Sequence, residues 1–231
     1  MEDEFLEKFW SFIPNSVEKR TETAEEISRK ILQAVPRDLP LISLDRVYLP
    51  YAENYLEVTR RTNPQTGEVT IAERFGSCPI EEQIKRIKQY PRVNIADVGA
   101  FEGDTILSIC QKLAEKDIAV ERVYLGFSDN RAKKKIGEKA VILEAFDFYE
   151  WIELRDLFGI DGRLVGTLNG KRAYMPYWEN LPKWASIQQE YELECAKLCK
   201  KYYRKVINLL KSNNLDINNI GIPIRYQGGT K

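Results

Sequence analysis

Apolar runs of strand length alternate with helical patterns through the middle of the chain, and this alternation limits the fold more than any other feature. The run VNIADVGA at 93–100 indicates a buried strand, and apolar residues in helical spacing follow it over 106–113. The segments VERVYLGF at 120–127 and AVILEAF at 140–146 indicate two more strands. Because strands that alternate with helices are typical of a parallel sheet, we expect an α/β protein with a parallel-sheet core.

The residues before this core predict a helical cover followed by a β-hairpin. One amphipathic helix is expected over Phe5–Ile13, and a second is expected to follow a cap supplied by Ser16 or Thr23. Next, the segment NPQTG supplies turn residues inside a predicted hairpin at 55–75. We therefore assign residues 1–40 to an N-terminal helical cover.

The residues after the core predict an irregular hood region and a long C-terminal helix. The stretch 147–186 is rich in aromatic residues and punctuated by Gly and Pro, which favours a compact irregular subdomain that could wall a pocket. A helix is expected from Ile187 to Ser212, followed by a loose tail. The chain then divides into 1–40, an α/β core with its hood at 41–186, and a C-terminal helix and tail at 187–231.

The overall charge gives no indication of a nucleic-acid or membrane partner. The 35 basic and 35 acidic residues cancel, so no global field draws the chain onto nucleic acid or anionic lipid. No stretch approaches the roughly 18 apolar residues of a spanning helix, and the acidic start MEDEFLEKFW is unlike a signal peptide. The four cysteines are too few and too irregularly spaced for a disulfide framework. We expect a cytoplasmic protein, and leave open whether it forms a homo-oligomer or binds a partner protein.

The chain contains no histidine, which excludes several kinds of catalytic site. Ser-His-Asp, Cys-His and His-metal chemistry all require that side chain. Cys195 and Cys199 lie four residues apart, but without histidine or a second close cysteine pair we expect buried thiols and no metal ligands. Any proton transfer falls to Asp, Glu, Lys or Tyr, or to the leaving group of a substrate.

The turn after the first core strand carries the residues most suited to ligand binding. In a parallel α/β sheet, ligands bind at the carboxyl ends of strands, where free amides and the positive end of a helix attract anions. Asp97 falls at the predicted strand end, and Gly99 and Gly103 let backbone approach a ligand closely. Thr105 adds a hydroxyl beside the amides of 102–105. The segment therefore predicts an acid for sugar hydroxyls followed by a cradle for phosphate.

This turn, DVGAFEGDT, resembles the signature that binds phosphoribosyl pyrophosphate (PRPP) in type I phosphoribosyltransferases, where apolar residues lead to two acids and a short loop ending in Gly-x-Thr. The closest resemblance is to phosphoribosyltransferase-like bacterial proteins with an Asp-Asp-Gly-x-Phe-x-Gly-x-Thr turn, which Gly99 and Phe101 also match. The resemblance covers about 40–190, although its specific part is the turn. It implies a phosphoribosyltransferase-like α/β core and a transferase of the glycosyltransferase class.

The resemblance also implies a role for each matching position. Asp97 would orient the ribose hydroxyls, and the loop from Phe101 to Thr105, including Gly103, would hold the 5′-phosphate. A basic hairpin would meet the pyrophosphate, Mg²⁺ would be bound mainly through the ligand, and the hood would recognise the base. The partner would be a small ribose-phosphate or nucleotide. The hairpin residues concerned are Arg60, Arg61 and Arg74.

Three residues depart from the family pattern. Val98 stands where the second acid is expected, and Glu102 and Asp104 place carboxylates in a loop that should accept phosphate. Like charges a few ångströms apart disfavour anion binding unless a metal or an arginine compensates. The turnover of such a site could be altered or lost, which leaves a non-catalytic nucleotide-sensing or effector subunit as one alternative.

The same segment also resembles a motif of a second family. DVGAFEGDT also resembles the glycine-rich first motif of class I methyltransferases, including the FkbM-like group, which bind S-adenosylmethionine. That family usually ends its next strand with an acid for the adenosine ribose, whereas here Phe127 and Ser128 precede Asp129. It also needs five or six further elements after the motif. A hairpin before a short parallel sheet would favour the phosphoribosyltransferase interpretation, and a seven-stranded sheet with a terminal antiparallel strand would favour the methyltransferase.

Overall fold

The fold is known from a computed structural model of the chain. It describes residues 2–146, 163–168, 171–175, 187–215 and 222–223, apart from residues 18, 47, 51, 64, 65, 67, 75 and 76. Most of the predicted hood at 147–186 and most of the tail lie outside these residues.

Two compact units make up the chain, and both are discontinuous in sequence. The first unit contains residues 1–20, 60–70 and 150–231. The second unit contains 21–59 and 71–149, and it includes the whole predicted turn at 97–105.

A parallel sheet of five strands forms the centre of the second unit. Its four strand pairings among the described residues are all parallel, and the spatial order is β2-β1-β5-β6-β7. Counted in chain order this is 2-1-3-4-5, a doubly wound arrangement whose order reverses between β1 and β5. The strands are β1 (Leu41–Ser43), β2 (Asn54–Tyr55), β5 (Arg92–Ala100), β6 (Ala119–Asp129) and β7 (Ala140–Phe146).

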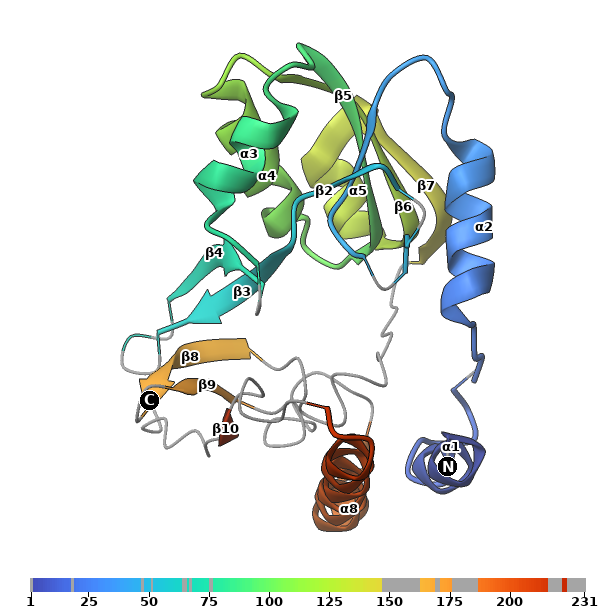
Figure 1. The fold of residues 1–231 in the computed structure, drawn as a ribbon. Helices are drawn as coiled ribbons and strands as arrows, with labels where there is room; N and C mark the ends of the chain where they lie inside the picture. Colours follow the sequence, from blue (N-terminus) through green and yellow to red (C-terminus); the bar gives the residue numbers. More distant parts are fainter. Residues whose placement is uncertain are drawn as a thin grey trace. The chain divides into compact units, whose positions relative to one another are not determined.

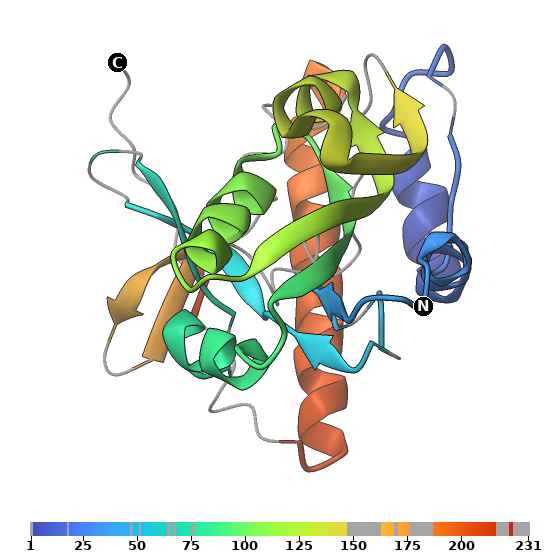
Figure 2. The same cartoon turned by 90° about the horizontal axis from the view of Figure 1, so that it is seen from above.

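Helices cover both sides of this sheet, with α2 on one side and α3 and α4 on the other (Figures 1 and 2). The short helix α5 follows β6 directly and is succeeded by one 3-10 turn. The apolar residues that α3 and α4 present at helical spacing join the strands in one buried core. The elements are α2 (Ala24–Ala34), α3 (Ile80–Ile87), α4 (Asp104–Ala114), α5 (Asn130–Ile136) and η1 (Gly137–Lys139).

The start of α2 decides between the two caps that the sequence left open. Thr23 is the N-cap, and its hydroxyl accepts a hydrogen bond from the backbone amide of Glu26. The Glu26 carboxylate in return accepts from the Thr23 amide at 2.8 Å, which completes a capping box. Ser16, the other candidate, lies outside the helix.

In the first unit, α1 (Glu2–Trp10) packs against α8 (Glu192–Ser212), which a 3-10 turn η3 (Gln189–Tyr191) precedes. Phe5 and Phe9 stack with their ring centres 5.6 Å apart, and Phe5 meets the ring of Tyr202 edge-on at 5.1 Å. Such aromatic pairs are worth about 0.5–1.5 kcal/mol beyond the area they bury. This small core holds the N-terminal helix against the long C-terminal one.

A second sheet has the order β10-β9-β8-β3-β4. The predicted hairpin is present, because the Asn63 amide donates to Glu68 and the Arg74 amide donates to Glu57, each at 2.8 Å. Within the predicted hood, β8 and β9 form an antiparallel pair that the sequence pattern did not indicate. The strands are β3 (Val58–Thr62), β4 (Val69–Glu73), β8 (Arg163–Leu168), β9 (Lys171–Met175) and β10 (Ile222–Pro223). The expected α/β class, with a parallel sheet, N-terminal helices and a long C-terminal helix, is confirmed.

Candidate functional site

The candidate site lies where the strand order of the parallel sheet reverses. β1 and β5 are neighbours there, and the Leu44 amide continues their pairing by donating to Ala96 at 2.9 Å. In open α/β sheets, ligands bind outside the carboxyl ends of the strands at this reversal point. The predicted turn leaves β5 at that edge, so the sequence and the topology indicate the same place.

Asp97 lies near the carboxyl end of β5, opposite Leu125 of β6. Its side chain is half-buried and accepts a hydrogen bond from the Val98 amide at 2.8 Å. Val98 itself is buried, with 6% of its surface exposed. Val98, which stands where the phosphoribosyltransferase signature has its second acid, therefore belongs to the packed interior.

Gly103 makes the change of direction between the turn and α4. Its φ of +78° lies in the left-handed region that favours glycine. A Cβ added there would lie 3.2 Å from Cγ1 of Ile136 on α5, so a side chain would also crowd the helix packed on the turn. No side chain caps α4, and its first helical bond runs from the Leu107 amide to the Gly103 carbonyl. The amides of the first turn of α4, which include that of Thr105, therefore have no earlier turn to bond to, and they form the positive end of the helix.

The two acids of the turn form ion pairs with α5. The carboxylate of Glu102 lies 2.6 Å from Nη1 of Arg131, and Asp104 forms an ion pair with Lys135. All four side chains are exposed, so solvent weakens these pairs. The helix after the next strand thus supplies a basic side chain to each acid of the turn.

Arg131 is held in place by a buried acid at the end of β6. Its Nε and Nη2 donate to the two oxygens of Asp129 at 2.9 and 3.0 Å. Asp129 is 2% exposed, and it also caps α5 by accepting from the Arg131 amide at 2.8 Å. The hydrogen bonds that Arg131 donates hold the pKa of Asp129 below its usual range, against the opposing effect of burial. The pair fixes one guanidinium beside the turn.

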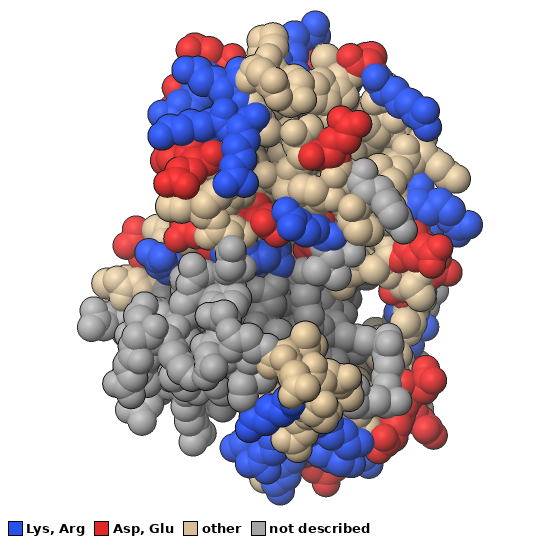
Figure 3. Space-filling view, viewed as in Figure 1, with Lys and Arg blue, Asp and Glu red and all other residues tan. Residues whose placement is uncertain are grey.

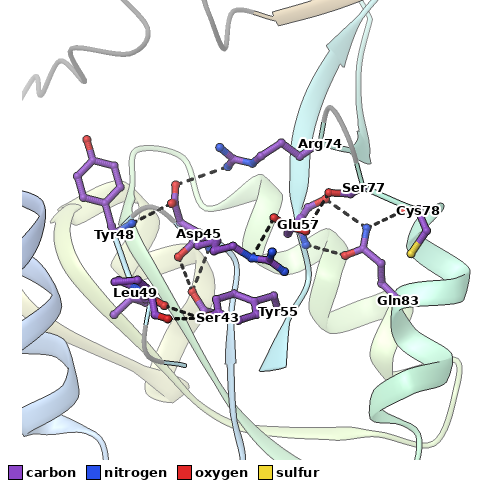
Figure 4. Close-up of polar contacts among 12 residues, drawn as sticks. Ser43, Asp45, Tyr48, Leu49, Tyr55, Glu57, Arg74, Ser77, Cys78 and Gln83 are labelled. Atoms are coloured by element: carbon purple, nitrogen blue, oxygen red, sulfur yellow. Dashed lines mark hydrogen bonds and ion pairs between the residues drawn. The ribbon is translucent and has the colours of Figure 1, made fainter. Parts of the chain in front are cut away.

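A second polar network surrounds the carboxyl end of β1 (Figure 4). Asp45 is 1% exposed, lies 3.5 Å from Nη2 of Arg74, and accepts from the Tyr48 amide at 3.1 Å. Nearby, the buried amide of Gln83 accepts from the Glu57 backbone at 2.7 Å and donates to the Cys78 carbonyl at 2.7 Å. The ion pair ties the end of the hairpin to the segment after β1, and the Gln83 amide ties its start to α3 (Ile80–Ile87).

The predicted basic residues of the hairpin lie in different surroundings. Arg74 belongs to the second unit and pairs with the buried Asp45. Arg60 and Arg61 are exposed residues of β3 in the first unit. Their contact with a pyrophosphate stays a prediction.

Sequence interpretation missed Asp45, Asp129, Arg131 and Lys135. The run NRAKKK after a strand was a usable signal, because a basic helix directly after a core strand starts at the same sheet edge as the turn. Its partners were not visible, since 31 residues separate Lys135 from Asp104 along the chain.

Three further findings concern metal ligands, cysteines and membrane-spanning helices among the described residues. They contain no group of three or more Cys, Asp or Glu side chains that could hold a metal ion. All four cysteines are free, and Cys195 and Cys199 are buried. None of the helices in the described ranges combines the length and the apolar character that crossing a bilayer requires.

Among solved structures, the chain is similar to the adenine phosphoribosyltransferase of Thermoanaerobacter pseudethanolicus, with 15% identity and a TM-score of 0.32 over 61% of this chain and 99% of that one. It is also similar to the UMP synthase of Leishmania donovani, with 14% identity and a TM-score of 0.30 over 78% of this chain and 32% of that one. No protein-family model matches the chain, and no curated protein matches it. Similarity at this level assigns the chain to neither protein's family.

Proposed function

We propose that the chain binds PRPP or a related ribose-phosphate ligand at the turn after β5. Asp97 accepts hydrogen bonds from the ribose hydroxyls. The amides from Phe101 to Thr105, with the Thr105 hydroxyl, hold the 5′-phosphate at the start of α4. Gly99 and Gly103 let the backbone approach the ligand.

The position of the turn is the observation that carries this proposal. It leaves β5 where the strand order reverses, and it leads through a left-handed glycine into a helix of 11 residues without a side-chain cap. A helix start of this kind presents backbone amides and a positive dipole end to an anion. An acid six residues before Gly103, on the same strand end, suits a ribose attached to that anion.

The ion pairs with α5 weaken the main objection to phosphate at this turn. Glu102 and Asp104 are each paired with a basic side chain, so their repulsion of an incoming anion is reduced. Arg131 stays anchored to Asp129 when it releases Glu102. A bound phosphate can therefore replace the Glu102 carboxylate on a guanidinium that is already in position.

We further propose that Mg²⁺ is bound mainly through the pyrophosphate of the ligand. Transfer or cleavage at C1 of the ribose would pass through an oxocarbenium-like transition state. Such a reaction needs charge placement and leaving-group stabilisation more than a strong base, which suits a chain without histidine. A reducing cytoplasmic location is part of the same proposal. Altered or lost turnover, suggested by Val98, Glu102 and Asp104, is its alternative.

One observation favours S-adenosylmethionine as a second candidate. β6 extends to Asp129, two residues beyond the predicted strand, so an acid does end the strand after the motif. Both oxygens of that acid are held by Arg131, however, and the parallel sheet of the second unit has five strands, with the hairpin strands β3 and β4 between its second and third strands in chain order. The topology favours the ribose-phosphate ligand.

A thermal-shift panel tests the proposal. The ligands are PRPP with Mg²⁺, PRPP alone, nucleoside monophosphates and S-adenosylmethionine. A ligand present at 100 times its dissociation constant adds about 2.7 kcal/mol to the free energy of unfolding, so binding raises the melting temperature. We expect a shift with PRPP and Mg²⁺. A shift with S-adenosylmethionine alone would reverse the assignment, and no shift with any phosphate ligand would refute it.

A further inference from the structure

The outer face of α8 concentrates positive charge in a chain whose total charge is zero. Residues 195–215 contain six basic residues and no acidic one. With 3.6 residues per turn, all six project within an arc of roughly 140° and extend over about 21 Å of helix. They are Lys197, Lys200, Lys201, Arg204, Lys205 and Lys211. Figure 3 shows Lys and Arg side chains gathered over this helix.

Most of these charges have no acidic partner in the described part of the chain. Lys201 and Lys205 share Glu4, at 3.7 and 3.3 Å. The remaining four are exposed and form no ion pair among the described residues. They are Lys197, Lys200, Arg204 and Lys211.

Helix stability does not explain this arrangement. Basic residues in the last turn favour the negative end of a helix, but here five of the six lie before that turn. Lys197 with Lys201, and Lys200 with Arg204, are like-charged pairs four residues apart, which destabilise a helix. The face is therefore suited to an external anion.

The opposite face of α8 is already occupied. Cys195, Cys199 and Tyr202 are fully buried in the core that α8 forms with α1. An amphipathic helix that binds a membrane inserts its apolar face into the lipid, and this one is not available for insertion. No aromatic residue lies within the basic arc, so the stacking platform that single-stranded nucleic acids use is absent from the described face.

We propose that the basic face of α8 docks on the phosphate backbone of double-stranded DNA without sequence preference. The basic residues extend over about 21 Å of the helix and project to both sides of the middle of their arc. They can therefore contact phosphates of both DNA strands. The major groove of B-DNA admits an α-helix, whereas the deep and narrow major groove of A-form RNA does not. The proposal depends only on the first unit and is independent of the ligand at the turn.

Titration of a fluorescent 24-base-pair DNA duplex of mixed sequence tests this proposal. Four phosphate contacts predict a slope of about −3.6 for the logarithm of affinity against the logarithm of salt concentration, equal to a loss of roughly 150-fold between 50 and 200 mM salt. The variant neutralises the four unpaired residues and should lose at least about 100-fold in affinity at 50 mM salt. Its substitutions are Lys197→Gln, Lys200→Gln, Arg204→Gln and Lys211→Gln.

A control variant removes the same charge from exposed residues of α2 and α3 and of the loop after α3. It should bind DNA as the wild type does. Its substitutions are Arg29→Gln, Lys85→Gln, Arg86→Gln and Lys88→Gln. Equal losses in both variants, or no binding of DNA by the wild type at 50 mM salt, would overturn the proposal. So would tighter binding to duplex RNA, or binding to phosphatidylserine vesicles without binding to DNA.

Discussion

The turn after β5 and the outer face of α8 both carry several charges, but they arrange these charges in opposite ways. Around the turn, acids and bases are paired, as in Glu102 with Arg131 at 2.6 Å and Asp129 with the same arginine at 2.9 Å. On α8, four of six basic residues have no ion pair among the described residues. A net charge of zero therefore covers two different local situations.

This difference indicates what kind of anion each region can accept. A paired region binds an anion by exchange, since the anion must replace a carboxylate on a base that is already in position. That suits a small ligand whose phosphate fits one helix start. An unpaired region attracts an anion without exchange, and a long row of charges suits a polymer. The total charge of a chain predicts neither the paired region nor the unpaired one.

The largest expected effect is the removal of the acid that anchors the paired region. Asp129→Ala deletes the cap of α5 and both hydrogen bonds from Arg131, and it should lower the free energy of unfolding by about 2–4 kcal/mol. Urea unfolding measures this loss. An effect below about 0.5 kcal/mol would show that the buried pair does not organise the region.

A smaller effect is expected on ligand binding. Asp97→Asn removes a charge-assisted hydrogen bond to the ribose and should weaken binding of a ribosyl ligand by about 1.5–3 kcal/mol. Isothermal calorimetry with the folded variant measures the change. Unchanged affinity would remove Asp97 from the site.

The charge of Asp129 also predicts a dependence of stability on pH. The pKa of this acid is lowered by the hydrogen bonds from Arg131, so its stabilising effect is complete above its unfolded pKa of about 3.9 and is lost as the pH falls through the lower folded pKa. Asp129→Asn keeps a capping side chain but loses the charge, and should cost about 1–2 kcal/mol at pH 7. This difference from the wild type should shrink below about pH 4. A constant difference down to pH 3 would contradict the assigned pairing.

The smallest effect is expected for a substitution on α8. It should raise the free energy of unfolding, whereas the substitutions of Asp129 lower it. Lys200→Gln relieves repulsion from Arg204 one turn away, so it should stabilise the protein by about 0.2–0.5 kcal/mol, or roughly 1 °C in melting temperature. Differential scanning calorimetry at low salt measures it, and high salt should remove it. A loss of stability on this substitution would mean that Lys200 has a structural partner.

Three strands of the parallel sheet, β5, β6 and β7, were predictable because their signals are local, whereas β1 and β2 were not assigned to it. The apolar run of β5, the left-handed glycine at 103 and the cap at Thr23 all act within a few residues of the chain. The end of β6 was placed two residues early, since Ser128 and Asp129 have the composition of a turn. They continue the strand because Arg131 satisfies the buried carboxylate.

The charge partners of the candidate site could not be predicted from the sequence. Glu102 and Arg131 meet only because α4 and α5 start at the same edge of the sheet. Asp45 and Arg74 likewise meet across a strand and a hairpin. Such pairs depend on tertiary structure, and no local pattern in a single sequence indicates them.

Titration of PRPP with Mg²⁺ at low ionic strength into the wild type and the double variant Glu102→Gln, Asp104→Asn tests the central claim most directly. If the turn holds phosphate, the variant frees Arg131 and Lys135 for the ligand and should bind roughly tenfold more tightly. A control with Glu81→Gln and Glu82→Gln removes two exposed acids from α3 and should leave the affinity unchanged. Tighter binding in the first variant alone is the predicted result, and no detectable binding of PRPP to any of the three proteins would contradict the account.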